Sequence, residues 1–242
     1  MIRKDKMMKT ECVYEHNGND TLLYCASFIG AFTRSGSKEE ALSKMGKELR
    51  AYMRWSGEES PGTFEPIIVQ EKASELQIRD ADSDVIFETE CLPLTPEEYE
   101  RLKRLSLKSA EDFLRLYESV PDKHKSALQR RATFYGELPT TAYEMYEHTK
   151  NVNSYYFGEI GVEADNVGTI RECRERGFAA LEKTPDFLNG GVVCGSCGEL
   201  WSLAKVLRRF IWHDRIHAKA MFKMAMLTFG EGSVDDAFRF GE

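Results

Sequence analysis

The stretch LRRFIWHDRIHAKAMFKMAM, residues 207–226, decides how the second half of the chain folds. Its apolar residues recur every three or four positions, a spacing that predicts an amphipathic helix. His213 and His217 lie four residues apart on the same stripe as Phe210 and Met224. Both imidazoles are therefore expected to face the apolar interior. The pattern extends over residues 199–230, and Gly230 is the expected end of the helix.

Three further segments before this stretch show the same helical periodicity. They cover residues 95–120, 138–161 and 166–185. The first begins with Thr95 as a cap and Pro96 in the first turn, both typical of a helix start. Four amphipathic helices in succession predict an all-α four-helix bundle.

The first ninety or so residues mix strand and helix patterns. ECVYEH (11–16) and TLLYCASF (21–28) flank the turn signal NGND and predict a hairpin. A helix is expected over 37–55, and FEPIIVQ (64–70) and DVIFETECL (84–92) are expected to be strands. The order predicts an α+β domain, a small antiparallel sheet with one helix on a face. We place this domain at residues 1–93 and the bundle at 94–242.

Composition excludes several classes of function. The formal net charge of −7 argues against a nucleic-acid binder, because phosphate contacts need clustered Lys and Arg. No run approaches 18 apolar residues, so no membrane span is expected. The first residues lack the apolar segment of an export signal, and the six cysteines are expected to be mostly thiols in a reducing cytosol. We expect a cytoplasmic protein.

A third histidine makes a metal site the preferred interpretation. His148 shares a helical stripe with Met145 and Val152, so it too is predicted to face the bundle interior. A single buried histidine is commonly neutral and hydrogen-bonded, but three unpartnered imidazoles buried together are costly, and a cation offsets that cost. Three imidazoles leave coordination positions open, as in catalytic sites. Zn, Ni, Fe and Cu all suit imidazole, with Zn and Ni preferred here.

Two acidic residues are candidates for supporting roles. Asp214 follows a predicted ligand; it is either a catalytic acid–base group, a support for a ligand, or the ion-pair partner of Arg209 or Arg215. Glu144, one turn before His148, either orients that imidazole or is solvated. His213–His217 also matches H-E-x-x-H with Asp for Glu, but no third zinc-protease ligand follows it.

At these residues the second half resembles the DinB/YfiT-like superfamily of metal-binding four-helix bundles. EHTKNVNSYYF (147–157) and VLRRFIWHDRIH (206–217) carry the resemblance, which covers roughly residues 100–230. It implies that His148, His213 and His217 hold a divalent metal. It also implies addition of a low-molecular-weight thiol, as co-substrate, to a small electrophilic substrate.

FIGAFTRSGSKEEAL (28–42) is similar to HicB-type domains. This resemblance implies a HicB-like N-terminal domain that binds a protein partner or forms a homodimer. Two function classes follow for the whole chain. The first is a metal-dependent thiol transferase or hydrolase. The second is a non-catalytic adaptor in which the metal is structural or absent.

VVCGSCGEL (192–200) contains one C-x-x-C pair, Cys194 and Cys197. A single pair is weak support for zinc, and no βαβ unit precedes it, as a thioredoxin-like motif would require. A glycine-rich loop before the last helix is the preferred interpretation.

Overall fold

The structure, a computed structural model, describes residues 6–59, 62–80, 82–133 and 136–241. The chain divides into two compact units between Thr89 and Glu90. The first is an α+β unit and the second is mainly helical, which confirms the fold class predicted from sequence. The expected domain boundary at residues 93/94 stays a prediction.

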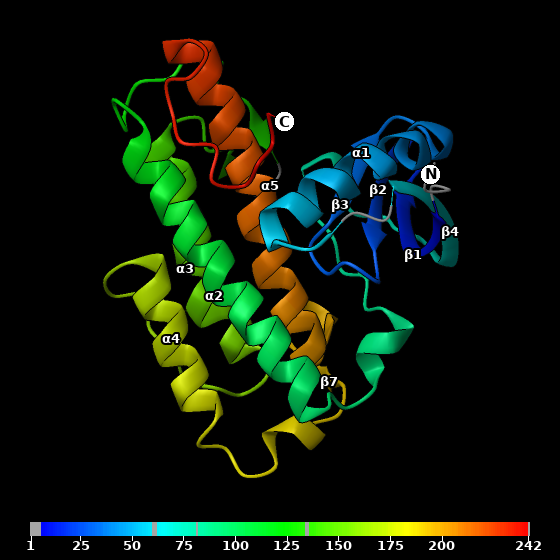
Figure 1. The fold of residues 1–242 in the computed structure, drawn as a ribbon. Helices are drawn as coiled ribbons and strands as arrows, with labels where there is room; N and C mark the ends of the chain where they lie inside the picture. The colour runs from blue at the N-terminus through cyan, green and yellow to red at the C-terminus, as the bar shows by residue number, and fades with distance from the viewer. Residues whose placement is uncertain (1–5, 60–61, 81, 134–135, 242) are drawn as a thin grey trace. The chain divides into compact units, whose positions relative to one another are not determined.

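A four-stranded mixed sheet with one helix forms the first unit (Figure 1). Its strands are β1 (Lys6–Asn17), β2 (Asp20–Cys25), β3 (Phe32–Ser35) and β4 (Gly62–Ala73), in the order β3-β2-β1-β4. The predicted hairpin is present as β1 and β2. Helix α1 (Lys38–Ser56) packs against β2, β3 and β4, and its N-cap is Ser37, as the sequence predicts.

Two details of the predicted sheet are wrong. β4 runs parallel to β1, because β3, α1 and β4 form a crossover connection that returns the chain in the same direction. The run 84–92 forms no strand; it ends in a 3-10 turn, Glu88–Cys91. Its alternation marks real burial, since Val85 and Phe87 are buried, but side-chain bonds such as Gln70 Nε2 to the Ile86 carbonyl hold it.

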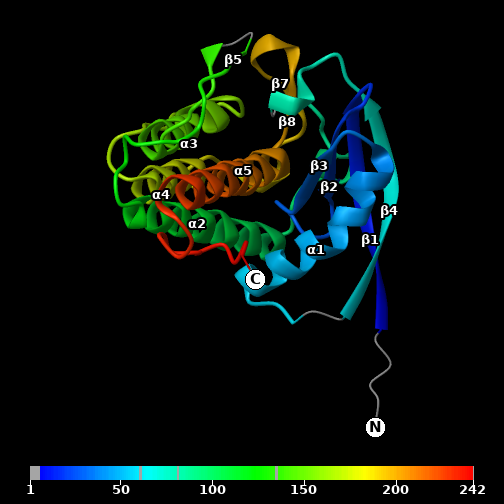
Figure 2. The same cartoon turned by 90° about the horizontal axis from the view of Figure 1, so that it is seen from above.

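The described part of the second unit contains four α-helices: α2 (Pro96–Ser119), α3 (Ala142–Gly158), α4 (Ile170–Leu181) and α5 (Leu203–Phe229). Figure 2 shows them side by side. Helices α2 and α3 each pack against both α4 and α5. Two short hairpins, β5 (Ala132–Thr133) with β6 (Gly136–Glu137) and β7 (Val193–Cys194) with β8 (Leu200–Trp201), lie in the connections.

Candidate metal centre

Helix α5 positions two of the three histidines. Ser202 caps it by accepting the Lys205 N–H, and the helix then runs unbroken for 27 residues. His213 and His217, one turn apart near its middle, lie on the same face. Their ring centroids are 4.5 Å apart.

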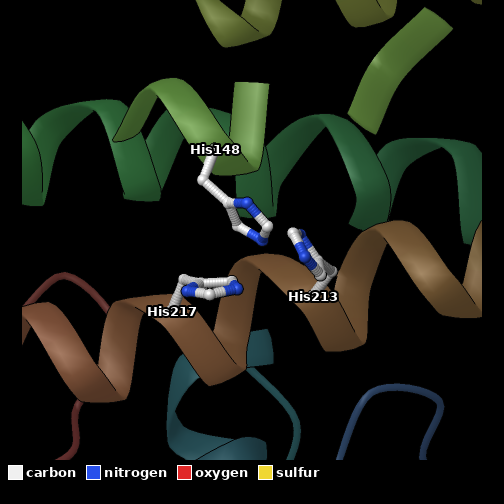
Figure 3. Close-up of side chains that lie close together, drawn as sticks. All are labelled: His148, His213 and His217. Carbon is white, nitrogen blue, oxygen red and sulfur yellow. The ribbon is translucent and has the colours of Figure 1, made fainter. Parts of the chain in front are cut away.

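Helix α3 brings His148 to the same place. Thr141 caps this helix together with Glu144. The His148 ring centroid lies 5.1 Å from that of His213 and 4.7 Å from that of His217. One nitrogen from each ring can be chosen so that all three lie within 4.8 Å of one another. Figure 3 shows the rings of His148, His213 and His217 directed toward a common space.

The three histidines differ in exposure, which corrects the prediction that all face the interior. His213 is buried, His217 is half-buried and His148 is exposed. The buried face of α3 is formed by neighbours such as Met145, Thr149 and Tyr156. His148 thus lies at the edge of that face, and its ring reaches α5 from the accessible side. The three rings therefore meet although His148 does not lie in the core.

The surroundings of His213 and His148 favour the neutral form of these two imidazoles. Burial, followed by the neighbouring His217 and His148, holds the pKa of His213 well below its usual value. Desolvation also lowers the pKa of His148. Nδ1 of His213 is buried and lacks a hydrogen-bond partner among the described residues. Neutral imidazoles are the form that binds metal, and a buried ring nitrogen without a partner is costly unless an ion or water satisfies it.

Asp214 is not part of the histidine cluster; its carboxylate contacts helices α2 and α4. Its carboxylate accepts hydrogen bonds from Arg174 of α4, at 2.5 and 3.1 Å, and from the Ser109 hydroxyl of α2, at 2.5 Å. Asp214 and Arg174 are both fully buried. The predicted basic partner, Arg209 or Arg215, is wrong, because no local pattern in the sequence marks an arginine of α4 as the partner of Asp214. A catalytic role for Asp214 stays a prediction.

The contacts of Glu144 lie at the start of α3. Its carboxylate accepts hydrogen bonds from the backbone N–H groups of Thr140 and Thr141 and from Arg130. These contacts complete the capping box of the helix that carries His148. The predicted support of His148 by Glu144 stays a prediction.

Aromatic side chains wall the buried end of the site. Tyr156 lies edge-on to His213, with ring centroids 5.9 Å apart, and Trp201 packs on Tyr156 at 5.5 Å. Arg209, one turn before His213, lies over the Tyr156 ring at 5.8 Å and pairs with Glu199 at 3.1 Å. Arg209 was expected only as a candidate partner of Asp214, and its position beside His213 was not predicted. Its spacing from His213, the same four residues that relate the two histidines, could have indicated that position.

Cys194 and Cys197 are not part of the histidine cluster. Both are exposed thiols at the hairpin formed by β7 and β8. The expected glycine-rich loop before the last helix is therefore present, in the form of this hairpin.

Among the described residues, no helix combines the length and the apolar content needed to cross a membrane. No family model matches the chain, and no curated protein or solved structure shows significant similarity to it. The site is thus defined by its own geometry: two helices of one unit bring His148, His213 and His217 together in an arrangement that could hold a divalent metal ion.

Proposed function

We propose that this protein is a metal-dependent enzyme in which His148, His213 and His217 bind one divalent cation, zinc or nickel. The observation that carries the proposal is the convergence of three imidazoles from two helices within 4.8 Å. Two of them come from adjacent turns and one from a separate helix, so the set depends on the tertiary structure.

The donor set fits such an ion. With Zn–N bonds of about 2.0–2.1 Å, tetrahedral geometry requires ligand nitrogens about 3.3 Å apart. The nitrogens of this triad are at most 4.8 Å apart, so small rotations of the rings bring them into range. The buried Nδ1 of His213 shows that this imidazole has a polar atom to satisfy. Three protein ligands are the number found in catalytic zinc sites, which keep a position open.

The exposure of the three rings favours a catalytic site over a closed structural one. His213 anchors the buried end, while His148 lies at the accessible edge of α3. A small molecule can therefore approach from the side of His148. Tyr156 packs edge-on against His213 at the opposite, buried end and excludes solvent there.

The reaction class rests on the resemblance to DinB/YfiT-like bundles at residues 147–157 and 206–217. A divalent cation on this triad would lower the pKa of a coordinated thiol or water and so supply a nucleophile near neutral pH. We propose attack of a low-molecular-weight thiol, or of water, on a small electrophilic substrate. In this proposal His148, His213 and His217 position the nucleophile, and Asp214 fixes α5 through Arg174.

Metal analysis of the purified chain tests the proposal. We expect close to one equivalent of zinc or nickel, and a loss of affinity of at least about tenfold in each of His148→Ala, His213→Ala and His217→Ala. His124→Ala is the matched control, because His124 is exposed and packs on Tyr143 outside the triad. Helical content measured by circular dichroism should stay near that of the parent in all four variants.

The same variants separate the enzyme from the adaptor interpretation. If thiol addition to a model electrophile such as an epoxide requires the metal and disappears in all three triad variants, the enzymatic proposal stands. A chain that purifies without metal and gains none on incubation with zinc or nickel would contradict it. Unfolding of the helices on metal removal would indicate a structural ion instead.

A further inference from the structure

The hairpin of β7 and β8 presents two thiols at one loop. Cys194 is the last residue of β7, and Cys197 lies in the five-residue connection to Leu200. The connection is closed by a hydrogen bond from the Gly195 N–H to the Glu199 carbonyl, 2.8 Å long. Both thiols are exposed. The hydrogen-bonded turn therefore places Cys194 and Cys197 in one short loop of the hairpin.

The backbone between the two cysteines is held against the end of α3. The Glu159 carboxylate accepts a hydrogen bond of 2.7 Å from the Ser196 N–H and bonds the Ser196 hydroxyl as well. A Cβ on Gly195 would lie 1.8 Å from Glu159 Oε2 and 2.6 Å from Trp201 Cδ1, so only glycine fits at that position. The loop therefore has a defined conformation, which Glu159 and Trp201 hold on its inner side.

Cys197 has a backbone conformation that a non-glycine residue rarely adopts. Its φ is +59°, in the left-handed region, where the Cβ crowds the following carbonyl oxygen. An exposed loop gains nothing in packing from cysteine at such a position, where glycine or asparagine fits better. Backbone strain of this kind clusters at functional sites. Here the side chain is an exposed thiol in the same loop as a second one.

The set of nearby ligands favours redox chemistry over zinc. A closed structural zinc site needs four ligands. Within the described residues, the clusters of three or more potential ligand side chains include the histidine triad but not these two cysteines. Two exposed thiols in one loop, without further donors, are suited to thiol–disulfide exchange.

We infer that Cys194 and Cys197 form a redox-active dithiol, which closes to an intramolecular disulfide by exchange with a low-molecular-weight disulfide. The thiolate of one cysteine attacks a sulfur of the small disulfide, forming a mixed disulfide and releasing one small thiolate. The second cysteine, as its thiolate, then attacks the protein sulfur of the mixed disulfide. The S–S bond between Cys194 and Cys197 forms, the second small thiol leaves, and two electrons have passed to the small molecule.

The experiment equilibrates the full-length chain with mixtures of glutathione and glutathione disulfide, quenches with acid, alkylates the free thiols and maps the tryptic peptides by mass spectrometry. Residues 184–205 form one peptide that holds Cys194 and Cys197 and no other cysteine. We expect this peptide to lose two hydrogens and both alkylation sites as the mixture becomes more oxidising. The internal disulfide should exceed the mixed disulfides on this peptide by about tenfold, since the second step is intramolecular.

Single variants test the pairing. In Cys194→Ser and Cys197→Ser the internal disulfide cannot form, and the remaining cysteine should accumulate the mixed disulfide with glutathione. Cys91→Ser, which removes an exposed cysteine distant in sequence from the others, should leave the behaviour of residues 184–205 unchanged. Circular dichroism checks that the variants stay folded. If a variant unfolds, the titration of the parent chain still tests the inference.

Three outcomes overturn the inference. The peptide 184–205 could keep both thiols under all mixtures, or carry two mixed disulfides in place of the internal one. The thiols could also be protected by a bound zinc ion that disappears in Cys194→Ser and stays in His213→Ala. The last result would assign the loop to metal binding, separately from the histidine triad.

Discussion

Asp214 and His213 are adjacent in sequence, yet their side chains contact different residues. His213 joins the other two imidazoles, whereas Asp214 forms a fully buried ion pair with Arg174 and a hydrogen bond with Ser109. Burial raises the pKa of Asp214, against the influence of Arg174 and Ser109. This pair ties α5 to α4 and α2, so it fixes the rotation of the helix on which His213 and His217 stand.

Replacing Asp214 by Asn should lower the free energy of unfolding by about 3–5 kcal/mol, because it leaves the Arg174 guanidinium buried without an anion. Urea unfolding followed by circular dichroism measures the loss. The control is Asp165→Asn, which breaks the exposed pair with Arg176 and should cost at most about 1 kcal/mol. Equal losses in the two variants would show that the buried pair stabilises the fold no more than the exposed pair does. Metal stoichiometry in the folded Asp214→Asn chain should stay unchanged.

Spacing predicted the residues of the site better than it predicted their burial. The i,i+4 relation of His213 and His217 is a property of any helix, so it could be derived from sequence. That His148 meets them depends on how α3 packs on α5, and its exposure depends on a rotation of α3 that periodicity does not resolve. Arg174 could not be found at all, because nothing local marks a charged residue of α4 as the partner of Asp214.

At the scale of the elements, three helices of the second unit begin with the same capping motif. Thr95 with Glu98, Thr141 with Glu144, and Thr169 with Glu172 each form a capping box, which satisfies backbone N–H groups at the helix start. For α3, partial burial raises the pKa of Glu144, but hydrogen bonds from the Thr140 and Thr141 N–H groups and from Arg130 outweigh it. The resulting pKa is about 2.

The Glu144 cap should make stability depend on pH in acid. Because the folded pKa lies below the usual 4.5, the ionised carboxylate stabilises the fold above pH 4.5, and this contribution is lost as pH falls toward 2. Parent and Glu144→Gln chains should therefore differ by about 1 kcal/mol at pH 6 and converge near pH 2. Urea unfolding across this range measures the difference. Glu163→Gln, in the exposed loop before α4, should follow the parent; a constant offset for Glu144→Gln would remove the electrostatic explanation.

Two helical glycines should respond oppositely to alanine. A Cβ at Gly177 of α4 would lie 2.1 Å from Cε2 of Phe157 on α3, so Gly177→Ala forces these helices apart and should cost about 1–3 kcal/mol. At Gly46 of α1 the nearest atom to a Cβ, Arg50 Nη1, is 3.7 Å away. Gly46→Ala should therefore stabilise by about 0.5–1 kcal/mol through helix propensity. Thermal unfolding of both variants tests the pair, and stabilisation by Gly177→Ala would contradict the close packing of α3 on α4.

At the scale of the whole molecule, the sequence predicted the order of an α+β unit and a helical unit because each has its own periodicity. The caps of two helices, Ser37 and Thr95, were predicted to the residue, because a capping side chain acts locally. The other three helices begin about four residues later than expected, at Ala142, Ile170 and Leu203. The strands were harder to predict from sequence, because β3 is only four residues long and the direction of β4 depends on the α1 crossover. Within the predicted strand 84–92, buried and half-buried residues alternate as far as Phe87, but side-chain hydrogen bonds hold this segment and no strand pairing does.

Metal binding should stabilise the two units unequally, because all three proposed ligands belong to the helical unit. An ion that binds only the folded state at 100 times its Kd adds about 2.7 kcal/mol to the stability of the part that forms the site. Hydrogen exchange with and without zinc, read by mass spectrometry, should show slower exchange in α3 and α5. The exchange of peptides from β1, β2 and β4 should be unchanged.

The His213→Ala chain, treated in the same way, should show no difference in exchange with and without zinc in either unit. Equal slowing in the sheet and the helices would mean that the two units open as one, and protection confined to the sheet would exclude the triad as the site of binding.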